Sequence, residues 1–295
     1  MLRFSYAAAS HVGLVRSNNE DAGYAGAYLL LVADGVGGAA AGEIASASTA
    51  YVTSSVSMIS QDDPLDVLAQ SVDFAHRHLQ DGVAVDPRRD GMSTTLTAVL
   101  GNGERFGLVH IGDSRGYQWR DGQLMPITRD HSLLQMMLDS GELRPEDAAD
   151  FPYRSVIARS INQLEEPEPD LVLLDLQVGD RILLASDGLT DIVDVAHIGR
   201  AVAEPDLDAA VQRLVELALA AGGRDNITCI LGEVVEGDLI HPRGTLVGSA
   251  ADPANLIDGA AIRTSRRAGR RTASLQTINR WSTDSRHRVS ARSAG

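Results

Sequence analysis

Short runs rich in Val, Leu, Ile and Thr follow one another along this chain, interrupted by long helical blocks. The clearest predicted strands are residues 28–33, 93–100, 106–110, 171–176, 181–185 and 227–234. The predicted helices are residues 42–57, which are mostly small, and residues 64–79 and 207–221, which have apolar residues at three- and four-residue spacing. Because strands and helices do not alternate strictly, the pattern favours an α+β layered sandwich over a doubly wound parallel sheet.

Negative charge is distributed unevenly along the sequence. The formal net charge is −14, but residues 241–295 contain ten Arg and three Asp, so the first 240 residues carry −21. A domain this acidic repels phosphate backbones, and we expect no nucleic-acid binding. We expect no membrane span, because no stretch approaches the roughly 18 apolar residues that one requires. The single cysteine, Cys229, and the lack of an apolar N-terminal run of secretory length fit a cytoplasmic protein.

Composition changes near residue 237. Residues 1–236 alternate apolar stretches with turn signals, whereas residues 237–295 are rich in Ser, Ala, Gly and Arg with scattered apolar residues. Such a composition rarely buries enough surface to offset the loss of chain entropy on folding. We therefore predict a folded domain of residues 1–236 and a disordered tail of residues 237–295. The arginines of the tail could contact an acidic partner or the acidic domain itself.

Four aspartates lie beside predicted apolar strands. Asp34 and Asp187 each end an apolar run and precede a glycine, Asp113 follows another run, and Asp225 stands just before the last strand. Any one of them is compatible with an ordinary turn, since Asp-Gly is the commonest hairpin signal. Four converging carboxylates, however, would repel one another unless a cation lay between them. With no His or Cys directly beside these aspartates, we expect that cation to be Mg²⁺ or Mn²⁺, which prefer oxygen ligands.

A pair of such ions would supply a nucleophile. Two ions about 3.5–4 Å apart can bridge a water molecule and lower its pKa, which gives a hydroxide near neutral pH. Arg16, in the segment RSNNED, could bind two oxygens of a substrate phosphate at once. Glu20 and Asp21 in the same segment could accept hydrogen bonds from metal-bound water. Considered by itself, this segment would be interpreted as a solvent-exposed turn.

Seven strings occur in order along the predicted domain: GLVRSNNEDA, LLLVADGVGGAAAGEIAS, GMSTTLTAVL, LVHIGDSRGY, ITRDHSLLQMMLDSGEL, ILLASDGLTD and GGRDNITCIL. In this order they resemble the metal-dependent protein phosphatase family (PPM, type 2C) in its bacterial form. The resemblance implies a four-layer αββα sandwich, in which two central antiparallel β-sheets are flanked by helices and a dinuclear metal centre lies at one end. Residues 139–160 resemble the flap beside the active site of that family.

The resemblance also implies a set of metal ligands. Asp34 would bridge both ions, and the Gly35 carbonyl would bind the second ion. Asp187 and Asp225 would complete the first. Asp113 matches a position that, in bacterial members, can help Asp187 hold a third and weaker ion.

Further residues match the surroundings of that centre. Arg16 matches the arginine that binds the substrate phosphate. Glu20 and Asp21 match residues that contact metal-bound water, and Asn226 follows the last metal-binding aspartate as the family pattern requires. Where animal members have DGHGG, this chain has Val36 in place of the histidine proposed as general acid. Metal-bound water is then our candidate for protonating the leaving oxygen.

Three histidines are expected to have no role in the metal centre. His131 lies in the DHS string of the family and is predicted to support the fold. His76 and His78 are two residues apart on a predicted helix, cannot share a face, and are expected at the surface.

The function implied by the resemblance is hydrolysis of phosphoserine and phosphothreonine in proteins, by direct attack of a metal-bound hydroxide and without a phosphoenzyme. The substrates would be phosphoproteins, including bacterial Ser/Thr kinases and their targets. Alternatives are a pseudophosphatase that acts as a binding module, a hydrolase of other phosphate esters, and a phosphatase dedicated to one regulatory protein. The first alternative predicts broken metal ligands, whereas Asp34, Asp187 and Asp225 are all present.

Overall fold

The computed structural model describes residues 1–36, 41–59, 62–238, 240 and 243–259. Its strands form two sheets in which every pair is antiparallel. The first sheet has the order β1 (Leu2–His11), β12 (Ile227–Glu236), β11 (Arg181–Ala185), β7 (Arg115–Arg120) and β8 (Gln123–Pro126). The second has the order β10 (Asp170–Leu174), β6 (Phe106–Ile111), β5 (Leu96–Gly101), β3 (Leu29–Val36), β2 (Asp21–Gly26) and β13 (Gly244–Gly248). The short strands β4 (Ser93–Thr94) and β9 (Ile161–Asn162) extend the second sheet from the end of β3.

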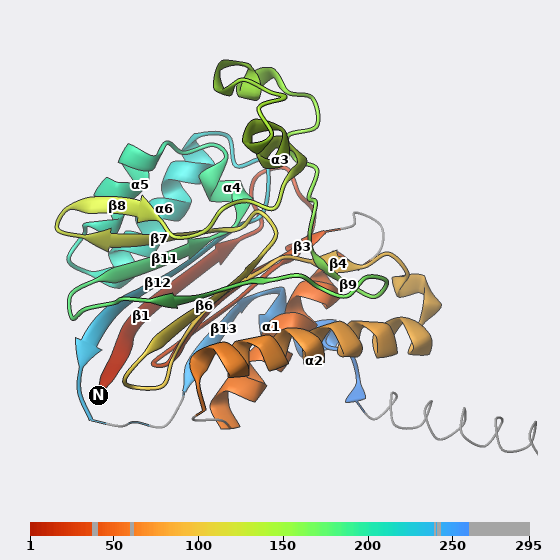
Figure 1. Cartoon of the computed structure of the whole chain (residues 1–295), viewed down its shortest axis with the longest axis horizontal. Coiled ribbons are helices and arrows are strands. Elements are labelled where there is room, and N and C mark those ends of the chain that lie inside the picture. Colours follow the sequence, from red (N-terminus) through yellow and green to blue (C-terminus); the bar gives the residue numbers. More distant parts are fainter. Residues whose placement is uncertain (37–40, 60–61, 239, 241–242, 260–295) are drawn as a thin grey trace, which may run out of the picture.

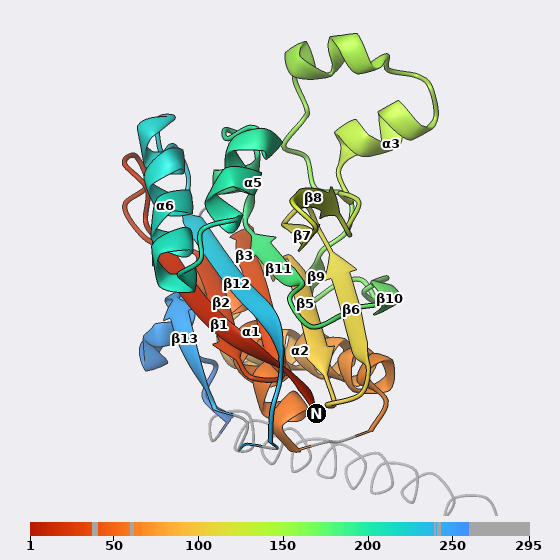
Figure 2. The ribbon, with the colours of Figure 1, turned by 90° about the vertical axis from the view of Figure 1, so that its left-hand side faces the viewer.

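Helices cover the outer face of each sheet (Figures 1 and 2). Helices α5 (Val195–Val202) and α6 (Leu207–Ala220) pack on the first sheet, and α1 (Gly42–Ile59) and α2 (Pro64–Val85) pack on the second. The two sheets face each other across a third apolar core. This arrangement confirms the predicted α+β fold with four αββα layers.

Central strands are buried on both faces, which explains their nearly continuous apolar sequences. In β3, Leu29 and Leu31 point toward the helices, whereas Leu30 and Val32 point toward the other sheet. This alternation follows from the two-residue period of a strand. Cys229 of β12 lies in the core beneath α5 and α6, where burial raises the pKa of its thiol. The cysteine is therefore an unreactive core residue.

The folded part of the chain extends beyond the predicted boundary at residue 236. Strand β13 pairs with β2, and Ala250 is buried immediately after it. Ile257 is also buried and packs against α2 so closely that a Cβ added at Gly82 would lie 2.5 Å from its Cδ1 atom. The predicted boundary at residue 236 is too early, because the apolar residues that follow it are few and separated by polar ones. Residues 260–295 of the predicted tail lie outside the described residues.

A protruding segment rises from one end of the sandwich (Figures 1 and 2). It contains α3 (Leu133–Asp139) and the 3₁₀ helix η2 (Pro145–Asp150), and its far part is the predicted flap, residues 139–160. The other short helices are η1 (Pro87–Arg89), α4 (Asp187–Thr190), η3 (Ser249–Ala251) and η4 (Pro253–Asn255). In the part of the chain that the structure describes, no helix has both the length and the apolar character needed to cross a membrane.

All three histidine predictions can be compared with the structure, and His78 is half-buried on α2. His131 contacts the backbone N–H of Gly112 and the carboxylate of Asp170 at 3.3 Å each, as expected of a residue that supports the fold. The surface position predicted for His76 is wrong. Its Nδ1 atom lies 2.7 Å from the carbonyl oxygen of Asn162, so His76 is buried between α2 and β9.

Candidate metal centre

The two Asp-Gly pairs are positioned by strand ends where backbone segments approach closely. Asp34 lies near the end of β3, and Asp187 begins α4 directly after β11. A Cβ atom at Gly35 would lie 2.3 Å from the carbonyl oxygen of Gly42, and one at Gly188 would lie 1.9 Å from that of Asn226. Neither position can accept a side chain without backbone movement. The glycines therefore allow each aspartate to reach the same region from a different sheet.

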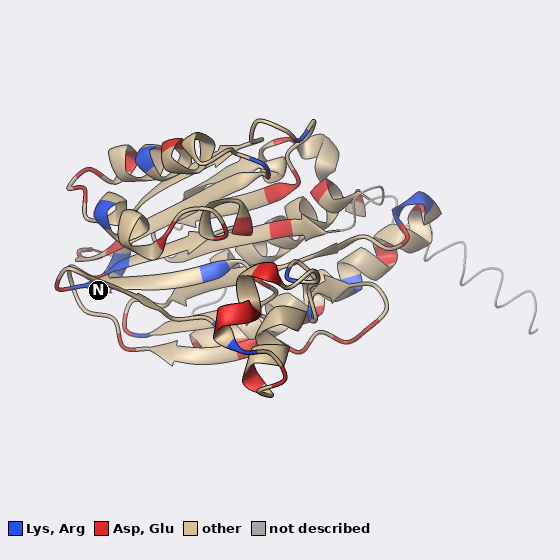
Figure 3. Cartoon of the chain, turned by 90° about the horizontal axis from the view of Figure 1, so that it is seen from above, with Lys and Arg blue, Asp and Glu red and all other residues tan. Residues whose placement is uncertain are grey.

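The other acids reach this region from neighbouring segments. Asp113 lies in the connection between β6 and β7, and Asp225 directly precedes β12. Asp21 begins β2 and is the direct partner of Asp34 in the β2–β3 register. Seen from above, acidic segments from several strands and loops lie near the middle of this face of the molecule (Figure 3). The structure thus brings together aspartates that are widely separated in sequence.

Burial and mutual repulsion perturb these carboxyl groups. The pKa of Asp34 is raised well above its usual range, first by burial and then by the nearby charges of Asp21, Asp187, Asp113 and Asp225. Burial, with Asp187 as the strongest charged neighbour, raises the pKa of Asp113 to about 7. Burial, followed by the charges of Asp191 and Asp225, raises the pKa of Asp187 to about 6, and its carboxyl group is within hydrogen-bonding reach of Asp34.

Asp21 is the most deeply enclosed of these acids, with 1% of its surface exposed. Burial raises its pKa to about 7, although it accepts a hydrogen bond of 2.7 Å from the Ser186 hydroxyl. A cation bound among these buried carboxyl groups would stabilise their ionised forms and so lower their pKa values.

Arg16 approaches the acids from the N-terminal loop. Its Nη2 atom lies 2.7 Å from Oδ2 of Asp225, while 49% of its side chain remains exposed. Asn226 holds this loop in place, because its Nδ2 atom donates to the carbonyl oxygens of Val12 and Asn18 at 2.9 Å. Its Oδ1 atom accepts from the Glu20 N–H at 2.8 Å. The segment that the sequence alone would have left as a solvated turn is therefore fixed against the end of β12.

Sequence reasoning missed the polar residues that hold the acids. The backbone N–H of Asp34 donates to Oγ1 of Thr95, and the N–H of Thr95 donates to the carbonyl oxygen of Asp34, each at 2.9 Å. Thr95 Oγ1 also lies 2.9 Å from the hydroxyl of Ser114, the residue after Asp113. Threonine and serine are common in buried strands, so their identity carried little signal. Their position within the GMSTTLTAVL and GDSR strings was the available clue.

The donor set fits a hard divalent cation in its chemistry. Carboxylate and carbonyl oxygens are the ligands that Mg²⁺ and Mn²⁺ prefer. Asp113 is 8% exposed, and its buried Oδ1 atom has no hydrogen-bond partner. Among the residues that the structure describes, no three His, Cys, Asp or Glu side chains are already arranged to enclose an ion. Binding would therefore require side chains such as Asp225, now paired with Arg16, to reorient, and the ligand assignments remain predictions.

Comparisons with known proteins agree with this architecture. Residues 15–232 match the family model described as protein phosphatase 2C. The serine/threonine protein phosphatase PstP of Mycobacterium tuberculosis is 44% identical over 250 residues, which are 83% of this chain and 48% of that protein. The chain thus spans about half the length of PstP. The protein phosphatase PhpP of Streptococcus pneumoniae is 34% identical over 242 residues, which are 77% of this chain and 96% of that protein.

Solved structures give the same result. A crystal structure of the PstP catalytic domain in complex with two manganese ions superimposes with a TM-score of 0.74 at 43% identity, covering 80% of this chain and all of that one. The serine/threonine phosphatase Stp1 of Staphylococcus aureus gives a TM-score of 0.71 at 30% identity, covering 79% of this chain and 96% of the other. Fold, ordered motifs and sequence identity agree, and this chain belongs to the protein phosphatase 2C family.

Proposed function

We propose that this chain is a metal-dependent serine/threonine protein phosphatase, which removes phosphate from phosphoserine and phosphothreonine in proteins. The observation that carries the proposal is the convergence of Asp34, Asp113, Asp187 and Asp225 at one end of the sandwich. Relatives named serine/threonine protein phosphatases, one of them solved with two manganese ions, support it.

In this proposal, four positions hold two Mn²⁺ or Mg²⁺ ions. Asp34 would be shared by both ions, the Gly35 carbonyl would bind one, and Asp187 and Asp225 would bind the other. Asp113 and Asp187 could hold a third. Two bound cations would lower the pKa of a water molecule between them and neutralise charge on the phosphoryl oxygens. Two hydrogen bonds with Thr95, one to its hydroxyl and one from its N–H, hold the Asp34 backbone at the end of β3, from which its carboxylate would reach both ions.

Arg16 is our candidate for binding the substrate phosphate. Its half-exposed guanidinium already lies beside Asp225, so a small rotation would turn it toward an anion at the mouth of the site. Arginine suits this role because its planar fork can donate to two phosphate oxygens. Asn226 fixes the loop that carries Arg16. In this proposal, Glu20 and Asp21 would accept hydrogen bonds from metal-bound water.

The proposed biological setting is signal transduction in the cytoplasm, where the chain would act on bacterial Ser/Thr kinases and their phosphorylated targets. A buried, unreactive cysteine is compatible with that compartment. The ten arginines between residues 241 and 295 could contact an acidic partner or the domain itself.

Hydrolysis of a phosphothreonine peptide by the full chain tests the proposal. We expect turnover with Mn²⁺ or Mg²⁺, none with a chelator, and none for Asp34→Asn, which removes the carboxylate shared by both ions. Asp208→Asn, at an exposed position in the first turn of α6, is the matched control and should be fully active. Equal rates with and without metal, or preference for a phosphodiester over the peptide, would contradict the proposal.

A further inference from the structure

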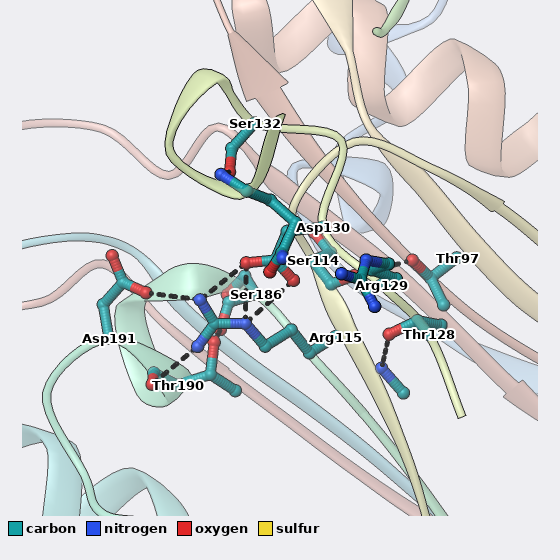
Figure 4. Close-up of polar contacts among 12 residues, drawn as sticks. Thr97, Ser114, Arg115, Thr128, Arg129, Asp130, Ser132, Ser186, Thr190 and Asp191 are labelled. Atoms are coloured by element: carbon teal, nitrogen blue, oxygen red, sulfur yellow. Dashed lines mark hydrogen bonds and ion pairs between the residues drawn. The ribbon is translucent and has the colours of Figure 1, made fainter. Parts of the chain in front are cut away.

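One arginine beside the acidic cluster is bound by Asp130, Asp191 and Thr190 (Figure 4). Arg115, at the start of β7, donates from Nε to both carboxylate oxygens of Asp130, at 3.0 and 2.9 Å. Its Nη2 atom lies 2.7 Å from Oδ2 of Asp130 and 3.1 Å from Oδ1 of Asp191. Its Nη1 atom donates to the carbonyl oxygen of Thr190 at 3.0 Å. Each guanidinium nitrogen is therefore engaged.

These contacts join the segments that carry two of the predicted ligands. Arg115 follows Asp113 by two residues, and it pairs with Ala185, two residues before Asp187, in the β7–β11 register. Thr190 and Asp191 end α4, whose first residue is Asp187, and the N–H of Asp191 donates to the carbonyl oxygen of Asp187 at 2.9 Å. Asp130 lies before α3, where the protruding segment begins.

Arg115 is more buried than Arg16 and forms more hydrogen bonds and ion pairs. Its side chain is 29% exposed and the Asp130 side chain is 14% exposed, so this pair is more buried than the Arg16–Asp225 pair, at 49% and 36%. With all three nitrogens engaged, Arg115 is poorly placed to bind a substrate phosphate. A cavity of about 250 Å³ is lined by Asp113, Arg115 and Asp191 together with Ala148 and Arg154 of the flap. The arginine thus borders both the ligand side chains and the flap.

We propose that Arg115 is a positioning residue, which holds Asp113 and Asp187 at the spacing required for metal binding by tying the start of β7 to the end of α4 and to the base of the flap. This inference rests on the proposed function, since it presumes that Asp187 binds a metal ion. Rigid forks of this kind fix the orientation of groups that would otherwise rotate.

The positioning role and the positive charge of Arg115 should have opposite effects on Mn²⁺ affinity, so removing the side chain distinguishes them. A nearby positive charge repels a divalent cation, so loss of charge alone would tighten Mn²⁺ binding. Loss of position would weaken it, because side chains that support metal ligands typically contribute about 10- to 100-fold to affinity. Arg115→Met removes both the charge and the fork, whereas Arg115→Lys keeps the charge and removes the fork.

The experiment is Mn²⁺ binding to the full chain, measured by isothermal titration calorimetry for both variants. We expect each to bind Mn²⁺ about 10- to 100-fold more weakly than the unmodified chain. The matched controls are Arg120→Met and Arg120→Lys, at the opposite end of the same strand, where Arg120 forms a similar two-contact pair with the buried Asp180. These should lower thermal stability but leave Mn²⁺ affinity unchanged.

Three outcomes would overturn the inference: unchanged affinity in both Arg115 variants, tighter binding in Arg115→Met, or normal affinity in Arg115→Lys. If either variant fails to fold, Arg115→Gln provides the test, because it also removes the charge and the fork, and charge and position again predict opposite effects on Mn²⁺ affinity. It should weaken Mn²⁺ binding, and normal affinity would count against the inference. Failure of the proposed function would be seen separately, as absence of Mn²⁺ binding and of peptide hydrolysis in the unmodified chain.

Discussion

Gly188 offers a direct way to displace a predicted metal ligand without touching its side chain. In Gly188→Ala, the new Cβ atom would lie 1.9 Å from the carbonyl oxygen of Asn226, whereas real Cβ contacts essentially never fall below 3.0 Å. The two segments must therefore separate by at least 1.1 Å. Because the Asn226 N–H donates to Oδ1 of Asp225 at 2.8 Å, this movement would also shift Asp225.

The expected effects follow from that displacement. Overpacking of this kind costs about 1–3 kcal/mol of unfolding free energy, which corresponds to a fall in Tm of about 2–12 °C for a domain of this size. Misplacing a reacting group by about 1 Å can cost about 100-fold in rate. Calorimetric melting, Mn²⁺ titration and phosphopeptide hydrolysis should all report the change.

Gly199→Ala is the matched control. Gly199 lies in α5, and its Cβ would lie 3.6 Å from Cβ of Leu124 in β8, which is an ordinary van der Waals contact. The substitution should raise stability by about 0.4–1 kcal/mol through the unfolded state and leave hydrolysis unchanged. If Gly188→Ala kept the Mn²⁺ affinity, Tm and hydrolysis rate of the unmodified chain, the close approach of the two ligand segments would not have the importance assigned to it here.

Three further predictions concern binding, support and pH. Arg16→Ala should raise KM for a phosphopeptide about tenfold or more, because the phosphate loses a two-contact partner. Tm should fall little, since the half-exposed Arg16–Asp225 pair contributes little stability. Unchanged KM and kcat would exclude Arg16 from phosphate binding. Asn226→Ala should lower the free energy of unfolding, measured in urea, by about 1–3 kcal/mol, since buried partners lose their hydrogen bonds. An equally stable variant would show that Asn226 does not anchor the loop. The rise in Tm produced by Mn²⁺ should grow from pH 6 to pH 8. Asp113 and Asp187, with pKa values raised to about 7 and about 6, destabilise the metal-free protein as they ionise, whereas the ion requires their ionised forms. A pH-independent rise in Tm would contradict this coupling.

Much of the fold was predictable because the central strands are strongly apolar. Residues 181–185 were predicted with the bounds of β11, and the sequences of β3 and β12 identified them as buried strands. Strand β2 (DAGYAG) was not recognised, since it has small residues and no β-branched side chain. Its strand conformation comes from pairing with the next strand, β3, and with β13, which is distant in sequence and lies beyond the predicted boundary. Local propensity cannot report such contacts.

The candidate site was predictable in its acids and unpredictable in their supports. Asp34 and Asp187 could be found because Asp-Gly follows an apolar run in both cases. The importance of Arg115 could not be found in this way, because its partners Asp130 and Asp191 come from two other segments and meet only in the folded chain. Asn226 was named only through the family resemblance, and its supporting role could not be derived, because its three side-chain hydrogen bonds reach residues more than 200 positions away.

Diffraction from crystals soaked in Mn²⁺, with anomalous differences recorded near the manganese absorption edge, tests the account most directly. We predict two strong peaks beside Asp34, whose carboxylate contacts both, with the Gly35 carbonyl on one and Asp187 and Asp225 on the other. The absence of peaks, or manganese bound away from Asp34, would contradict the account.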